Sequence, residues 1–365
     1  MRSILKFLMT LVLIAVIAVG GLLGWLTAVE FQPAPVEKAE LVSSGVNSPV
    51  KTGEDLSLLC WNIGYGGLGK NEDFFMDGGK LSKPQDRNVA LTYLDGIRGT
   101  IAEQAPDLVI LQEVDSDSSR TYGLDERSYL NQGMSSECYA LNYSCPFVPV
   151  PWPPIGKVHS GLFTMTKGFA IDEANRVALP CPFSWPLRIA NLKRCLLVSY
   201  LPIEGSDKQL VLVNLHLEAY DSGEGKIAQT KQLRSFIEDE YAKGNYVIAG
   251  GDFNQVFPGS LSIYPNTHEE NWKPGVLGAE LLPAGWTLAY DAATPTCRLL
   301  NQPYNPNDTQ GTQHYVIDGV ILSPNVELKI VKTVDAGFEN SDHNPVKVAF
   351  TLKSDVQNSA GTTVQ

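Results

Sequence analysis

Short apolar runs that end in polar residues constrain the fold of this 365-residue chain more than any other feature. Runs of this length, bounded by turn-forming residues, are typical of buried strands. They are LLCWNIG, LVILQEVD, LVNLHLE, IAGGDFN and YVIDGVI, and NSDHNPV precedes a further apolar run. The pattern predicts a strand-rich chain in which nearly every strand carries a polar residue suited to chemistry at or near its end.

Two amphipathic stretches alternate with these runs and predict helices. The first has apolar residues at helical spacing before Pro106: Val89, Tyr93, Ile97 and Ile101. The second precedes Gly244, a residue suited to the position after a helix end, and has one apolar face: Ile227, Leu233, Ile237 and Tyr241. Since no internal repeat interrupts this order, we expect one α/β domain over residues 54–353.

The N-terminus differs from the rest of the chain. Residues 7–29 form a run of 23 residues without a charge, long enough to cross a hydrocarbon layer of about 30 Å as a helix. Arg2 and Lys6 precede it, which favours a cytoplasmic segment 1–6 and an outward-facing domain. The rival interpretation is a cleaved signal peptide, but the run exceeds the usual apolar core of about 7–15 residues.

The segments that flank the domain lack an apolar pattern. Residues 30–53 contain Pro33, Pro35 and Pro49 without sustained periodicity and are expected to be a flexible extracellular linker. Residues 354–365 are expected to be a disordered tail. With 28 basic and 40 acidic residues the formal charge is −12, so a broad basic footprint for nucleic acid is absent, although a local basic groove is allowed.

The six cysteines show no C-x-x-C spacing, so a zinc site is not expected. In an outward-facing domain the pairs Cys138/Cys145 and Cys181/Cys195 are candidates for disulfides. Cys60 lies inside a strand-like run and is expected to be a buried small hydrophobe.

The polar residues of the apolar runs have two explanations. Asn and Asp often end strands and cap turns, and a single His beside an apolar run is commonly structural. Taken together, however, carboxylates, carboxamides and two histidines are the set that phosphoryl chemistry with a hard cation needs. These residues are Asn62, Glu113, Asn214, His216, Asp252, Asn254, Asp318, Asp342 and His343.

The order of these motifs resembles the endonuclease/exonuclease/phosphatase superfamily, which includes deoxyribonucleases, abasic-site endonucleases, neutral sphingomyelinases and inositol polyphosphate phosphatases. The motifs are WN, QE, NxH, GDFN, the Asp of YVIDGV and SDHNP, and the resemblance spans about Leu56 to Leu352. It implies a four-layer α/β sandwich of two mostly antiparallel β-sheets flanked by helices, preceded here by one N-terminal transmembrane helix. The site is then expected at one edge, where loops meet.

The resemblance, together with the negative charge that a phosphodiester carries, predicts the metal ligands. Glu113 is expected to be the principal ligand, Asn62 a neutral neighbour that orients a water or a phosphate oxygen, and Asp342 a further ligand. Magnesium, with manganese as a possible substitute, suits this sparse oxygen set because Mg²⁺ keeps several waters and needs only one or two carboxylates.

The other residues are expected to take part in proton transfer or to bind the reacting groups. His343 resembles the family histidine that contacts the scissile phosphate or acts as base, with Asp318 holding its tautomer. Asp252 is the competing base, and Asn254 fixes the nucleophile or a phosphate oxygen. His216 is expected to be a general acid or phosphate-binding partner from the opposite side, and the sequence leaves open which histidine gives and which takes the proton.

Two glycines precede Asp252. We expect Gly250 and Gly251 to let the backbone turn closely at the strand end, and side-chain alternation to place Asp252 and Asn254 on one face with Phe253 on the other.

The substrate-binding residues are less well marked. Asn214 shares the face of His216 two residues later. His159 stands where family relatives commonly have a different residue. Arg188, with Arg176 and Lys193, is a candidate to hold a headgroup or a second phosphate, against the alternative of ordinary surface charges. Two proline-rich aromatic stretches are expected to form the substrate rim or to pack on the sandwich; they contain Trp152, Phe183 and Trp185.

Three function classes follow. The first is a single-pass cell-membrane protein whose extracellular domain hydrolyses phosphodiesters, including lipid headgroups, without an evident obligate protein partner. The second is an extracellular nuclease acting on DNA or RNA. The third is a non-catalytic binding module of the same fold, against which the complete polar set argues.

Overall fold

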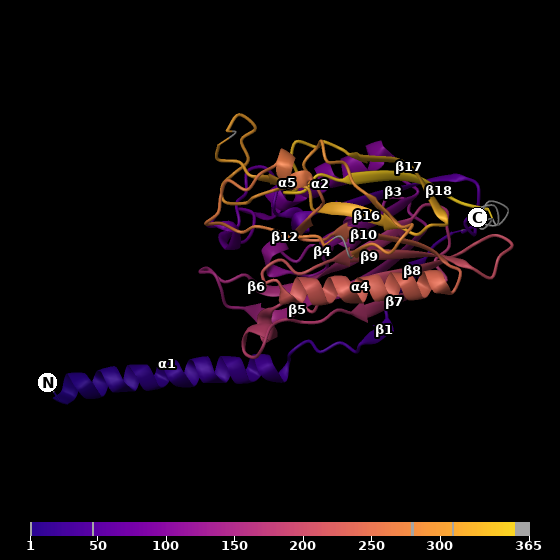
Figure 1. Cartoon of the computed structure of the whole chain (residues 1–365). Helices are drawn as coiled ribbons and strands as arrows, with labels where there is room; N and C mark the ends of the chain where they lie inside the picture. The colour runs from indigo at the N-terminus through magenta and orange to yellow at the C-terminus, as the bar shows by residue number, and fades with distance from the viewer. Residues whose placement is uncertain (1, 46, 279–280, 309, 355–365) are drawn as a thin grey trace.

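The computed structural model describes residues 2–354 except 46, 279, 280 and 309. A long helix projects from a body of stacked sheets (Figure 1). The expected disordered tail, from residue 355 on, lies outside the described residues.

The projecting helix is α1 (Arg2–Ala28). It meets the length and apolarity of a membrane span, with a mean hydropathy of 2.6 over its most apolar window, a criterion that signal sequences also meet. Most of its side chains face solvent, and Leu26 is its one buried residue among those described.

The first sheet has seven strands, and only β9 and β10 pair in parallel. In spatial order they are β1 (Val36–Lys38), β7 (Glu173–Ala178), β8 (Cys195–Pro202), β9 (Gln209–His216), β10 (Tyr246–Asp252), β16 (Asp318–Leu322) and β13 (Thr287–Ala289).

The second sheet also has seven strands, and only β3 and β4 pair in parallel. In spatial order they are β17 (Val326–Thr333), β18 (Val346–Leu352), β3 (Asp55–Asn62), β4 (Leu108–Asp115), β6 (Gly156–Thr166), β5 (Ser136–Val148) and β2 (Glu40–Ser43). Two short pairs lie in the loops: β11 (Gln255–Val256) with β12 (Gly275–Val276), and β14 (Cys297–Arg298) with β15 (His314–Tyr315).

The two sheets pack face to face around a shared apolar core. Leu58 and Ile110 of the second sheet and Leu212 and Ile248 of the first belong to one buried cluster, and all four are fully buried. Since both sheets bury one face here, each needs a helix on its other face.

Helix α2 (Arg87–Gln104) covers the second sheet. Its N-terminus is capped by Asp86, whose Oδ1 accepts hydrogen bonds from the backbone amides of Asn88 at 2.7 Å and Val89 at 3.1 Å. Leu94 and Ile97 are buried in the cluster that includes the outward-facing residues of β3 and β4. The helix predicted before Pro106 is therefore confirmed.

Helix α4 (Glu224–Ala242) covers the first sheet through Leu233 and Ile237. Ile227, which was predicted to share this face, is instead 54% exposed. Leu233 is six positions further along the chain, and at 3.6 residues per turn this spacing places Ile227 off the buried stripe. The remaining helices are short: α3 (Glu126–Leu130), α5 (Ser260–Ile263), η1 (Gly64–Gly66), η2 (Phe75–Asp77), η3 (Ser119–Thr121) and η4 (Leu187–Ala190).

The order helix, sheet, sheet, helix confirms the four-layer sandwich of two mostly antiparallel sheets expected from the sequence (Figure 1).

The segment expected to be a flexible linker is ordered along part of its length. Strand β1 pairs with β7 at the edge of the first sheet, and β2 pairs with β5 at the edge of the second. Between them the amide of Ala39 donates to the oxygen of Ala174 at 2.9 Å. Both strands are short and largely exposed, so they lack the apolar alternation that would have marked them as strands.

All six cysteines lie within the described residues and are free. Cys138 and Cys145 occur in the same strand, β5, where seven residues span roughly 23 Å, so they cannot form the expected disulfide. Cys181 is exposed and Cys195 is buried in β8, so the second expected pair is also absent. Cys60 is fully buried, as predicted.

Candidate active site

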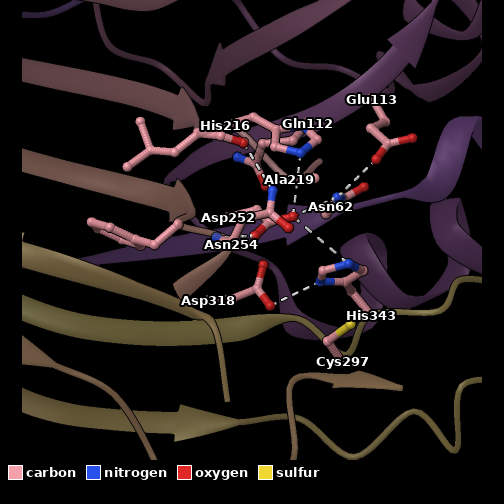
Figure 2. Close-up of polar contacts among 12 residues, drawn as sticks. Asn62, Gln112, Glu113, His216, Ala219, Asp252, Asn254, Cys297, Asp318 and His343 are labelled. Carbon is pink, nitrogen blue, oxygen red and sulfur yellow. Dashed lines mark hydrogen bonds and ion pairs between the residues drawn. The ribbon is translucent and has the colours of Figure 1, made fainter. Parts of the chain in front are cut away.

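Strand register brings three of the predicted residues side by side. Asp252, at the end of β10, lies opposite His216 of the parallel strand β9 and opposite Asp318 of the antiparallel strand β16. Figure 2 shows Asn62, Glu113 and His343 converging on the same place from the second sheet and its loops.

Glycines before Asp252 allow this close approach. Gly251 has φ 152°, and a Cβ there would lie 1.8 Å from the backbone oxygen of Leu215. Only glycine fits, because the obstacle is backbone rather than a movable side chain. Asn254 adopts the left-handed region with φ 50° beyond the strand end, so this turn, not strand alternation, directs it to the site. Phe253 packs away from it in the core under α4.

Asn62 joins the carboxylates of both sheets. Its Nδ2 donates to Glu113 Oε1 at 3.2 Å and to Asp252 Oδ2 at 3.0 Å, and its Oδ1 accepts from the amide of Gly64 at 3.0 Å. Glu113 has φ 57° at an irregularity of β4, between Leu111 and Val114. Such strained backbone often marks functional positions.

His343 is held from several sides. Its Nδ1 lies 2.8 Å from Asp318 Oδ2, and its Nε2 lies 3.8 Å from both Asp252 Oδ2 and Asp342 Oδ2. The backbone oxygen of His343 accepts from Trp61 Nε1 at 2.8 Å. Burial disfavours the imidazolium, but neighbouring Asp318 and other acidic groups raise the pKa of His343 well above its usual value.

His216 lies in a different electrostatic environment. Its Nε2 is 3.4 Å from Asp252 Oδ2, whereas its Nδ1 is buried without a hydrogen-bond partner among the described residues. Burial, together with the positive charges of Arg194 and His343, lowers the pKa of His216 well below its usual value. Burial and the nearby charge of Asp318 raise the pKa of Asp252 to about 7.

The carboxylates on the other side suit a cation. Burial raises the pKa of Asp342 to about 6, and the charge of Glu113 adds to this effect. Among the described residues neither Glu113 nor Asp342 forms an ion pair with lysine or arginine, although His343 Nε2 lies 3.8 Å from Asp342 Oδ2. An oxygen-rich group of this kind fits a hard divalent ion.

Two tighter groups of possible ligands also occur, and both contain His343. One adds Cys297 and Asp342, and the other adds Asp252 and Asp318. The hydrogen bond between His343 and Asp318 accounts for the second group without a metal. Neither group contains Glu113, whose oxygen atoms could hold a hard cation together with those of Asp342.

A cavity of about 500 Å³ lies at this site. Catalytic candidates in its wall are Glu113, His216, Asp252, Asn254, Asp342 and His343. Such a volume accommodates a substrate fragment together with its coordinating ion.

A family model described as "Endonuclease/Exonuclease/phosphatase family" matches residues 59–343, from within β3 to His343. The chain belongs to the endonuclease/exonuclease/phosphatase family. The match includes every residue assigned above to metal or proton chemistry, and members of this family hydrolyse phosphoester bonds.

Solved structures show the same fold. An endonuclease/exonuclease/phosphatase from Beutenbergia cavernae is 17% identical with a TM-score of 0.56, over 82% of this chain and 72% of that one. ANGEL2, a 2',3'-cyclic phosphatase, is 17% identical with a TM-score of 0.53, over 89% of this chain and all of that one. No curated protein matches this sequence.

Three residues predicted to bind substrate in this family member lie elsewhere. Asn214 is fully buried: its Nδ2 donates to the backbone oxygens of Leu111 at 2.9 Å and Phe163 at 3.1 Å. It joins the sheets instead of lining the cavity. His159 precedes Ser160, which lines the cavity, so strand alternation directs the His159 side chain away.

Arg188 also lies outside this cavity. Its Nε pairs with Glu30 Oε1 at 3.1 Å, beside a second cavity of about 280 Å³ that Arg176 and Lys193 also line. The basic residues that were predicted to bind a headgroup therefore lie near the end of α1.

Other residues of the cavity escaped the sequence analysis. Tyr220 donates to Asp77 Oδ1 at 2.9 Å, and burial raises the pKa of Asp77 to about 7. Arg120 is buried, binds both oxygens of Asp115 and lies 3.6 Å from the ring centre of Tyr65. Asp77 ends the short helix η2 in a stretch without sequence periodicity. Tyr220 follows β9 in the sequence HLEAYD, where nothing singled it out.

Proposed function

We propose that this chain is a Mg²⁺-dependent phosphodiesterase that cleaves its substrate by in-line attack of an activated water at the outer face of a membrane, with lipid headgroups as substrates. The observation that carries the proposal is the convergence of Glu113, Asp342 and Asn62 with the His343–Asp318 pair around Asp252. A phosphodiester needs both neutralisation of its charge and removal of a proton from water, and these two groups supply them.

Glu113 and Asp342 would hold the metal, with Asn62 beside them. A bound Mg²⁺ would supply charge neutralisation at the phosphate and at the departing oxygen. Asn62 contributes no charge, and its hydrogen bonds to Glu113 and Asp252 fix the spacing between the metal side and the base side of the site.

Asp252 is assigned as the base that takes the proton from water. Both of its oxygens are fixed, Oδ1 by the amide of Asn254 at 2.8 Å and Oδ2 by Asn62 at 3.0 Å. With Nδ1 directed to Asp318, His343 presents Nε2 to the phosphate as a hydrogen-bond donor. His216, on the far side of Asp252, faces the leaving group.

Several contacts support retention of α1 as an anchor. Thr27 Oγ1 accepts from Trp185 Nε1 at 3.1 Å, and the Glu30 carboxylate pairs with Arg188 and Lys193, each at 3.1 Å. Arg2 and the start of the chain then face the cytoplasm, which places the catalytic domain outside.

The reaction is tested with the full chain in lipid nanodiscs, supplied with Mg²⁺. The substrates are sphingomyelin, phosphatidylcholine, DNA, RNA and bis(4-nitrophenyl) phosphate. We expect hydrolysis of phosphodiesters, lost in excess chelator and restored by Mg²⁺. Undiminished turnover in chelator would overturn the metal mechanism. Faster cleavage of DNA or RNA than of lipid would favour the nuclease alternative, and no cleavage of any ester would favour a binding module.

Topology is tested on intact cells. Protease added outside should digest the catalytic domain, and the mature protein should keep the residues of α1. A mature form that begins near Glu30 would show a signal peptide instead of an anchor. Complete protection from external protease would contradict the outward orientation.

A further inference from the structure

The catalytic cavity has two chemically different walls. One carries the charged residues that act on the phosphate. The other is apolar and comes from the end of α1, the loop after β5 and the segment around η4; its residues include Leu23, Leu26, Val148, Ile155 and Ile189. A cavity of about 500 Å³ with this division fits a molecule with a phosphate at one end and a hydrocarbon body at the other.

The end of α1 is a fixed part of this wall. Leu26 is only 3% exposed and packs in one apolar cluster with Val148, Ile155 and Ile189. The ion pairs of Glu30 lie one turn further along the chain, and the Glu30 side chain is 2% exposed. Because apolar packing at Leu26 and the ion pairs of Glu30 both hold it, the last turn of α1 keeps its place beside the cavity.

The same loops expose large apolar side chains. Trp152 is 90% exposed, Leu187 65%, Val150 57% and Trp185 54%. Val150 and Leu187 also line the cavity. Tryptophans beside a membrane span commonly lie at the membrane interface, where an apolar ring and a polar N–H are both accommodated. The apolar wall is therefore continuous with a surface suited to lipid.

We infer that the apolar half of the cavity binds the hydrocarbon part of a membrane lipid phosphoester, and that Leu23 and Leu187 help to determine specificity for it. The inference rests on the proposed phosphodiesterase activity. It makes the membrane helix a component of the substrate site, because Leu23 belongs to α1. The scissile phosphate then lies at the charged wall, while the hydrocarbon part of the lipid extends out of the cavity between α1 and η4.

The test compares two substrates in the full chain held in nanodiscs with Mg²⁺. One is whichever of sphingomyelin and phosphatidylcholine is cleaved faster, and the other is water-soluble bis(4-nitrophenyl) phosphate. The quantity measured is the ratio of kcat/KM for the lipid to kcat/KM for the soluble ester. Leu23→Ala and Leu187→Ala should each lower this ratio about tenfold, mainly through KM for the lipid. Leu13→Ala, an equal change at a 59% exposed position of α1, should leave it within about twofold.

The outcomes separate this inference from the proposed function. A ratio that stays within about twofold in both cavity variants would overturn the inference while leaving the hydrolase intact. The same follows if the wild-type chain cleaves the soluble ester but neither lipid. If the wild-type chain cleaves neither the lipids nor the soluble ester, both the proposed function and this inference are wrong.

Discussion

Replacing Glu113 by glutamine is expected to lower kcat for phosphodiester hydrolysis by at least about 10³-fold. The change keeps the size of the side chain and removes its charge, so the proposed cation would lose its principal anionic ligand. The fold should persist, because Glu113 makes no ion pair with lysine or arginine among the described residues and accepts one hydrogen bond, from Asn62. Titration calorimetry with Mg²⁺ should show the same loss as weaker binding.

Glu103→Gln is the matched control, since Glu103 is exposed on α2 and lies outside the cavity. It should keep wild-type turnover and wild-type Mg²⁺ binding. Near-normal activity of Glu113→Gln at saturating Mg²⁺ would remove Glu113 from the metal site.

The two histidines should show large and coupled effects. His216→Ala and His343→Ala should each lower kcat at least about 10²-fold, with a smaller change in KM, if they act on protons or on transition-state charge. Both flank Asp252 Oδ2, at 3.4 Å and 3.8 Å, so the double variant should lose less than the product of the single losses.

His268→Ala serves as the control, because His268 lies outside the cavity and its Nε2 contacts the oxygen of Gln310 at 3.0 Å. Its turnover should match the wild type. Fully multiplicative losses in the double variant would show that the two histidines act independently, and normal turnover of His343→Ala would contradict its proposed role.

The residues of the candidate site could be predicted because they lie at or near strand ends, where polar residues stand out after apolar runs. Asp252 and His216 were recognisable in this way, and the order of the motifs specified the two-sheet fold. The register that places these residues opposite each other joins distant parts of the chain, and no local pattern encodes it.

Other features depend on long-range contacts and escaped prediction. Asn214 follows the same strand-end pattern as His216, but its amide connects β9 to β4 and β6 across the core. The partner of Arg188 is Glu30, 158 residues earlier. The apolar wall of the cavity was not foreseen, because Leu23 was assigned wholly to a membrane span.

The short strands β1 and β2 have a practical consequence for studying the catalytic domain by itself. They pair with the edges of opposite sheets, β7 in the first and β5 in the second. A fragment that begins after Gly53 would leave both edges with unpaired backbone amides and carbonyls, the arrangement through which sheets from different molecules join and aggregate. A fragment that begins at Pro35 would keep β1 paired with β7 and β2 paired with the start of β5, so we expect it to be the more soluble of the two.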